Sequence, residues 1–145
     1  MKFLVEQIAP QEEEEVRVRC HDTEEKWVGA IRAVTAGEAS VIGISDGKRY
    51  RLRLRDIFYF EIVEGRSFLY CEDRVFECRQ KLYEFETLCR GSMLFRCSKS
   101  MILNTDKIAC VRPSVSGRFE ATLVNQEKVI ISHQYVGELK RMLGI

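Results

Sequence analysis

A short polar and cationic cluster stands directly before an apolar segment at residues 101–103. The cluster reads Arg96, Cys97, Ser98, Lys99, Ser100. Arginine and lysine neutralise phosphates, and serine hydroxyls hydrogen-bond to phosphate oxygens or base edges. A solvated loop does not need an apolar anchor, and a buried strand does not tolerate such a cluster. The pattern therefore predicts a polar loop that a core strand holds in place.

Two other breaks between predicted strands carry cations, hydroxyls or amides. They are residues 64–67 (Glu-Gly-Arg-Ser) and residues 132–135 (Ser-His-Gln-Tyr), and each follows or abuts an apolar strand. Each is equally typical of an ordinary turn when taken alone. Together with residues 96–100 they indicate polar loops presented by a rigid sheet, which favours nucleic-acid binding.

Net charge is only +1 over 145 residues, but it is unevenly distributed. Residues 1–46 carry five Lys/Arg and ten Asp/Glu, whereas residues 47–145 carry eighteen Lys/Arg and twelve Asp/Glu. A basic body suggests an anionic partner, although many solvated surfaces share this composition. The length suits one domain, and the absence of a long apolar run or a signal-like start predicts a cytoplasmic protein.

The sequence contains no pattern typical of an enzyme. It has no Gly-rich phosphate loop and no G-x-S-x-G motif. Ser132 and His133 are adjacent in a strand and so point to opposite faces, which argues against a nucleophile–base pair. None of the six cysteines forms a C-x-x-C pair, so no zinc spacing is present. We expect reduced thiols, no metal, no cofactor and no catalysis; a redox pair that includes Cys97 is the alternative.

Strand-like segments dominate the chain after residue 38. Hairpins are predicted around the Asp46-Gly47 turn and around residues 72–74, and three further strands lie between residues 107 and 133. Helices are predicted over residues 80–91 and 134–144. Arg49, Arg51, Arg53 and Arg55 face one way along their predicted strand, as in a half-buried strand or a phosphate-facing row.

The front of the chain, residues 1–45, is predicted to be a separate strand–helix extension that serves in dimerisation or regulation. Residues 16–20 alternate with period two and predict a strand. Residues 21–38 predict a helix that Asp22 caps, with Trp27, Ile31 and Val34 on one face. Residues 46–145 form the second predicted unit.

The order of these segments resembles the LytTR family of bacterial DNA-binding domains. The likeness runs from about Leu54 to Leu143. It is carried by "DIFYFEIVEGRSFLY", "RVFECRQKLYEFETLC", "LFRCSKSMILNTDKIACVRP" and "ATLVNQEKVIISHQYVGELKRML". His133 stands where the family usually has Arg, and Leu103 where it usually has Val. The resemblance implies a mainly β (α+β) fold of packed antiparallel sheets with two short helices, which follows the N-terminal extension.

The resemblance also implies a function and a set of contact residues. The family uses loops, rather than a recognition helix, to reach successive major grooves of double-stranded DNA. By position, the residues matched to base contacts are Ser67, Lys99 and Gln134. Those matched to the DNA backbone are Arg66, Arg96, Ser98, Ser100, Ser132 and His133. Asn104 is expected to fix the turn behind the loop with its amide.

Residues 1–45 are too short for the phospho-acceptor receiver domain that many LytTR response regulators carry. The chain therefore resembles the receiver-less group, which implies a transcription regulator paired with a small membrane protein. Regulators of this kind commonly bind paired half-sites, so a homodimer is expected. Two alternatives stay open: a protein-interaction or anti-regulator module that keeps the fold without DNA, and single-stranded nucleic-acid binding through exposed aromatic residues.

Overall fold

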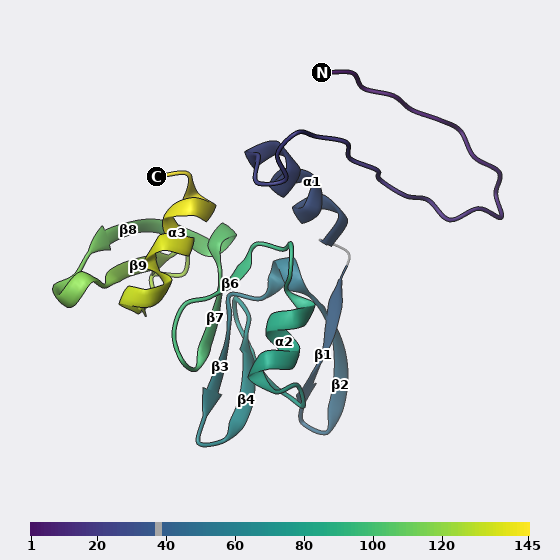
Figure 1. Cartoon of the computed structure of the whole chain (residues 1–145). Helices are drawn as coiled ribbons and strands as arrows, with labels where there is room; N and C mark the ends of the chain where they lie inside the picture. Colours follow the sequence, from purple (N-terminus) through teal and green to yellow (C-terminus); the bar gives the residue numbers. More distant parts are fainter. Residues whose placement is uncertain (37–38) are drawn as a thin grey trace.

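The computed structural model describes residues 1–36 and 39–145, which form two antiparallel sheets and three short helices. The larger sheet contains β1 (Ser40–Ser45), β2 (Lys48–Arg53), β3 (Tyr59–Val63), β4 (Arg66–Tyr70), β5 (Val75–Cys78), β6 (Leu94–Arg96) and β7 (Met101–Asn104). The smaller sheet contains β8 (Ile108–Pro113), β9 (Phe119–Leu123) and β10 (Lys128–Ile131). The predicted fold class, a mainly β protein with packed antiparallel sheets, is confirmed (Figure 1).

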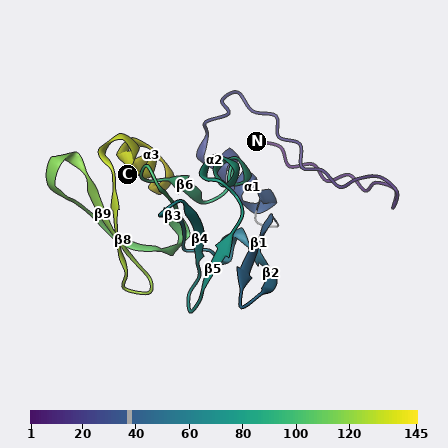
Figure 2. The same ribbon diagram turned by 90° about the horizontal axis from the view of Figure 1, so that it is seen from below.

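The larger sheet has the strand order β2-β1-β5-β4-β3-β7-β6, and the smaller has β10-β9-β8. The predicted hairpin turn at Asp46-Gly47 joins β1 to β2, and both turn residues have positive φ, 51° and 73°. Such angles match the twist of the flanking strands, which explains why an Asp-Gly pair closes this hairpin. Seen from below, β8 and β9 of the smaller sheet lie to the left of the larger sheet (Figure 2).

The first core lies between the larger sheet and α2 (Leu82–Leu88). Phe85 of this helix is fully buried and stacks on Phe60 of β3, with ring centroids 4.6 Å apart. The periodicity of residues 80–91 predicts this inward face. The strand alternation of β3 then requires that Tyr59 and Glu61 point to the other side of the sheet.

The second core joins the two sheets and α3 (Val136–Leu143). Phe58 and Leu103 from the larger sheet meet Leu123 and Ile131 from the smaller one, and Leu139 of α3 closes the cluster. The segment at residues 101–103 contributes to both cores, because Ile102 belongs to the first and Leu103 to the second. The predicted anchor behind the polar cluster is therefore confirmed.

The extension differs from its prediction. Residues 16–20 form no strand, and Val16 is 63% exposed. No second strand of the described chain pairs with this segment, so the alternation of apolar residues with arginine is not sufficient to make it a strand. The helix α1 (Lys26–Ala36) begins four residues after Asp22, whose carboxylate accepts the Glu24 N–H instead of capping the helix. Both of these local predictions were wrong.

The helix α1 lies near the C-terminus of α2 and the end of the chain. A side chain at Gly91 would lie 3.5 Å from Arg32, and one at Gly144 would lie 3.0 Å from the amine of Lys26. Val28 is buried, whereas Val34 on the predicted apolar face is 77% exposed. The division of the chain into residues 1–45 and 46–145 stays a prediction. β1 lies within residues 1–45, yet it pairs along its whole length with β2, which lies within residues 46–145.

Candidate nucleic-acid interface

Two of the three polar breaks meet at one end of the larger sheet. We call residues 64–67 the first loop, residues 96–100 the second loop and residues 132–135 the third loop. The Ile62 N–H donates to the Ser100 carbonyl over 2.8 Å, and Ile62 is also the strand partner of Ser67. The first and second loops therefore flank the same residue of β3.

The third loop is connected to the other two loops through the second loop. The Ser132 N–H donates to the Cys97 carbonyl over 2.9 Å, although the residues are 35 positions apart. The guanidinium of Arg96 lies 5.9 Å from the centre of the Tyr135 ring, within cation–π range. The fold thus assembles segments from three distant parts of the sequence into one continuous border.

Arg96 shapes the second loop from inside. Its Nε donates to the Ser98 carbonyl over 2.6 Å and its Nη2 to the Lys99 carbonyl over 2.7 Å. Its Nη1 lies 3.5 Å from Glu86 on α2, and the side chain is 25% exposed. These bonds use the planar fork of donors that arginine has and lysine lacks. The residue predicted to contact the DNA backbone also holds the loop closed.

The tip of the second loop is open to solvent at Lys99. Ser98 and Ser100 are half-buried beside it, and the Ser98 hydroxyl accepts the Ser100 N–H over 3.3 Å. No salt-bridge partner of Lys99 occurs within the described chain. Its ammonium is consequently free to reach an acceptor on a ligand.

The polar side chains of the first loop are less available to a ligand than Lys99 of the second loop. Arg66 forms a two-pronged ion pair with Glu77 of β5, with contacts of 3.1 and 2.8 Å. This pair raises the pKa of Arg66 and lowers the pKa of Glu77. Ser67 is only 9% exposed, and its hydroxyl donates to the Gln80 carbonyl over 2.6 Å. Its remaining acceptor capacity is what it can offer a ligand.

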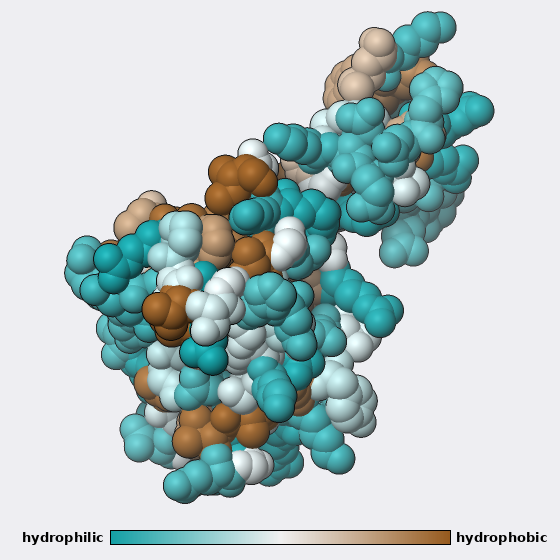
Figure 3. Space-filling view, turned by 60° about the vertical axis from the view of Figure 1, so that its left-hand side comes forward, coloured by the Kyte–Doolittle hydropathy of each residue, from teal (hydrophilic) through white to brown (hydrophobic). Residues whose placement is uncertain are grey.

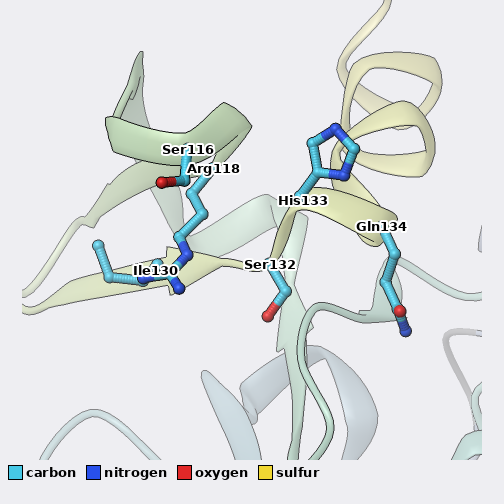
Figure 4. Close-up of a pocket in the computed structure, with 6 residues that line it drawn as sticks. All are labelled: Ser116, Arg118, Ile130, Ser132, His133 and Gln134. Carbon is cyan, nitrogen blue, oxygen red and sulfur yellow. The ribbon is translucent and has the colours of Figure 1, made fainter.

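The third loop borders a groove of about 460 Å³. The residues that line it are Ser116, Arg118, Ile130, Ser132, His133 and Gln134 (Figure 4). Arg118 extends toward β10, and the Ser132 and Gln134 side chains point the same way, whereas the His133 ring turns to the opposite side. The groove brings hydroxyl, amide and guanidinium groups together.

Arg118 and Ser116 are missing from the sequence-based predictions. They lie in the turn around η3 (Val115–Gly117), which the sequence interpretation treated only as a separator between strands. A cation directly after a Ser-Gly pair was the available signal. Gly117 has φ of +72°, and a Cβ built there would lie 3.2 Å from Nε2 of His133 and closer still to its Cδ2. The turn therefore packs directly on the third loop.

Asn104 fixes the strand end behind the second loop, as predicted. Its side chain is fully buried, its Nδ2 donates to the Ile57 carbonyl over 2.9 Å, and its Oδ1 accepts the Asp106 N–H over 2.9 Å. Cys97 is buried as well, and burial raises the pKa of its thiol to about 12. Both residues support the loop from below and neither is exposed to a ligand.

The parts of the chain that the structure describes hold no group of three or more metal-ligating side chains. Over residues 1–36 and 39–145, no helix is long and apolar enough to cross a membrane. A β scaffold that gathers Lys99, Arg118 and amide or hydroxyl side chains along one border is the arrangement expected of a nucleic-acid-binding domain.

Comparison with known proteins identifies the family. Residues 47–144 match the LytTr DNA-binding domain, so the chain belongs to this family and is a DNA-binding protein. The family is defined by DNA binding and not by catalysis.

Two related proteins show the extent of the likeness. The chain is 26% identical over 96 residues to the sensory transduction protein LytT of Enterococcus faecalis, covering 66% of this chain and 40% of that protein. It is also similar to the LytTr domain of a protein described as a methyl-accepting/DNA response regulator from Bacillus cereus, with 23% identity and a TM-score of 0.69. That match covers 75% of this chain and the whole of the solved domain, and it concerns the fold.

Proposed function

We propose that the protein is a transcription regulator that binds specific sequences of double-stranded DNA through its three loops. The observation that carries the proposal is a pair of backbone hydrogen bonds: Ile62, the strand partner of Ser67, donates to Ser100 of the second loop, and Ser132 of the third loop donates to Cys97 of the second. Loops fixed to one another can be complementary to DNA without reordering when it binds.

Base reading is assigned to Lys99, Gln134 and Ser67. Lys99 is an exposed donor that suits guanine acceptors, and the Gln134 amide can pair with adenine. Ser67 contributes by accepting, since its hydroxyl proton is engaged by Gln80. These three side chains give the specific part of the interaction.

Contacts to the DNA backbone are assigned to the residues around these three side chains. The set is Arg66, Arg96, Ser98, Ser100, Ser132 and His133, to which the groove adds Arg118. Arg96 makes its contact while it holds the second loop, and Arg66 must share its guanidinium with Glu77. The phosphate contacts position the protein but do not read the sequence.

We further propose that a homodimer binds paired half-sites in the cytoplasm, under control of a small membrane protein. Symmetric dimers match the symmetry of paired half-sites. The match covers only 40% of the sensory transduction protein, so the regulation of this chain need not follow that protein.

Equilibrium binding to one preferred site and to random DNA tests the assignment. Lys99→Ala should weaken binding to the preferred site by about 1–3 kcal/mol and leave random DNA nearly unchanged. His133→Ala should weaken both about equally. Equal losses on both DNAs for Lys99→Ala would remove this residue from base reading.

A further inference from the structure

The larger sheet has a second face that α2 does not cover. Directly paired residues of antiparallel strands point to the same side. One such row runs across five strands and consists of Arg49, Ile44, Glu77, Phe68 and Glu61. Phe60, the neighbour of Glu61, points toward Phe85 of α2. We call the side on which this row lies the outer face.

Only part of the outer face is packed. Over β3 and β7, Tyr59 and Met101 pack against the second core. Elsewhere on this face, Ile42 of β1 is 46% exposed, Val75 of β5 is 49% exposed and Val63 at the end of β3 is 38% exposed. None of these three belongs to either core cluster of the described chain. On β1, Ile42 and the half-buried Ile44 lie two residues apart on this face, so a short strip of branched apolar side chains borders solvent on a rigid sheet.

A cationic strip runs beside this apolar surface. On β2, Arg49 and Arg51 are the strand partners of Ile44 and Ile42. Both arginines are exposed, and Arg51 donates only to the hydroxyl of Ser40, over 3.3 Å. Neither forms a salt bridge within the described chain. The outer face thus combines an aliphatic strip with two guanidinium groups that lack a carboxylate partner.

The N-terminal segment has the opposite character. Phe3, Leu4 and Val5 are 82–90% exposed, and four consecutive glutamates follow at residues 12–15. A turn separates the two parts: the Glu12 N–H donates to the Ala9 carbonyl, and the Ala9 N–H donates to the Glu12 carboxylate, each over 3.0 Å. The segment projects from the body in both the ribbon and the space-filling views (Figures 1 and 3).

We propose that residues 3–15 dock on the outer face of the same chain. The apolar residues before the turn cover the aliphatic strip of β1, and the glutamates after it pair with the arginines of β2. A tethered segment has an effective concentration in the millimolar range, so docking within one chain outcompetes docking between chains at micromolar protein. The ten residues from Val16 to Glu25 can span about 33 Å when extended, which gives the segment reach.

Photo-crosslinking of the full chain without DNA tests this docking. Benzoylphenylalanine in place of Phe3 should crosslink to peptides that contain Ile42, Ile44 or Phe68, with a yield independent of protein concentration. The double variant Arg49→Glu/Arg51→Glu should lose most of this product, whereas Arg112→Glu on the smaller sheet should keep it. About 1 M salt should lower the yield several-fold by screening the ion pairs.

Other outcomes would overturn the inference. They are crosslinks mainly to α2, α3 or the three loops, products that form only between chains, or a yield that charge reversal leaves unchanged. Replacing Glu12, Glu13, Glu14 and Glu15 by Gln gives a second variant that leaves the folded body intact, and it should also lose the product. Because no DNA is present, failure of this test does not bear on DNA binding.

Discussion

The Ser132 N–H donates to the carbonyl of Cys97 and so ties the third loop to the second. The φ of Ser132 is −64°, a value that proline adopts without strain. Proline at this position therefore removes the donor while it keeps the backbone angle, and alanine removes only the hydroxyl.

We predict that Ser132→Pro lowers the free energy of unfolding by about 1–3 kcal/mol more than Ser132→Ala, because the Cys97 carbonyl loses its partner. Both variants should bind DNA more weakly, with the larger loss in Ser132→Pro. Denaturant unfolding monitored by circular dichroism measures the first effect and DNA titration the second. Equal unfolding energies for the two variants would mean that this bond contributes nothing to the structure.

Arg96 should be more important for the shape of the second loop than for phosphate binding. Arg96→Ala removes the donors that hold the Ser98 and Lys99 carbonyls, and Arg96→Lys cannot restore a planar fork. We expect both variants to speed amide hydrogen exchange at residues 97–100 and to weaken binding to every DNA sequence. If Arg96→Lys restores both properties, a single positive charge is sufficient and the fork is unnecessary.

Asn104 should be among the most sensitive polar positions. In Asn104→Ala, the buried Ile57 carbonyl and the Asp106 N–H both lose a partner, which should cost about 2–5 kcal/mol of stability. Asn125→Ala is the matched control. The side-chain oxygen of Asn125 also accepts the N–H of the residue two positions later, Glu127, but it does so at an exposed turn. Similar thermal midpoints for the two variants would contradict the anchoring role.

Arg118 should contact phosphate from the groove beside the third loop. Arg118→Ala is expected to weaken binding to all sequences and to reduce the slope of log K against log salt by about one. Arg112→Ala serves as the control, because Arg112 lies on β8, just before the turn that holds Arg118, but already pairs with Glu120 at 3.0 Å. A salt slope that changes equally in both variants would place Arg118 outside the interface.

The Cys97 thiol should be inert despite its position in the second loop. Burial raises its pKa to about 12, so almost none of it is thiolate at neutral pH, and the thiolate is the reactive form. Cys110 is exposed and provides the internal comparison. An aromatic disulfide reagent should modify Cys110 rapidly and Cys97 only on unfolding, as peptide mapping can show. Fast modification of Cys97 in the folded protein would support a redox role.

The strands and the two helices of the body were predictable because each has a strong local pattern. The Asp46-Gly47 turn, the alternation along β2 and the spacing of Phe85 within α2 all agree with the packing that forms. The strand predicted at residues 16–20 failed because alternation alone does not supply a partner strand.

The interface was only partly predictable from sequence. The composition of the loops indicated Lys99 and Gln134 as exposed polar residues, but not that Ser67 is buried or that Arg96 turns back on its own loop. Those outcomes depend on hydrogen bonds between residues that are distant in sequence, such as Ser67 with Gln80. Arg118 was missed for the same reason, since only the fold brings its turn beside His133.

We propose that the three loops together read the sequence of double-stranded DNA. The most direct measurement is selection of bound sequences from a random double-stranded pool at physiological salt, with wild type and Lys99→Ala in parallel. Wild type should enrich a repeated motif with fixed half-site spacing, and Lys99→Ala should relax the preference at one position of each half-site. If wild type enriches no motif, the loops do not read sequence and the proposed function is wrong.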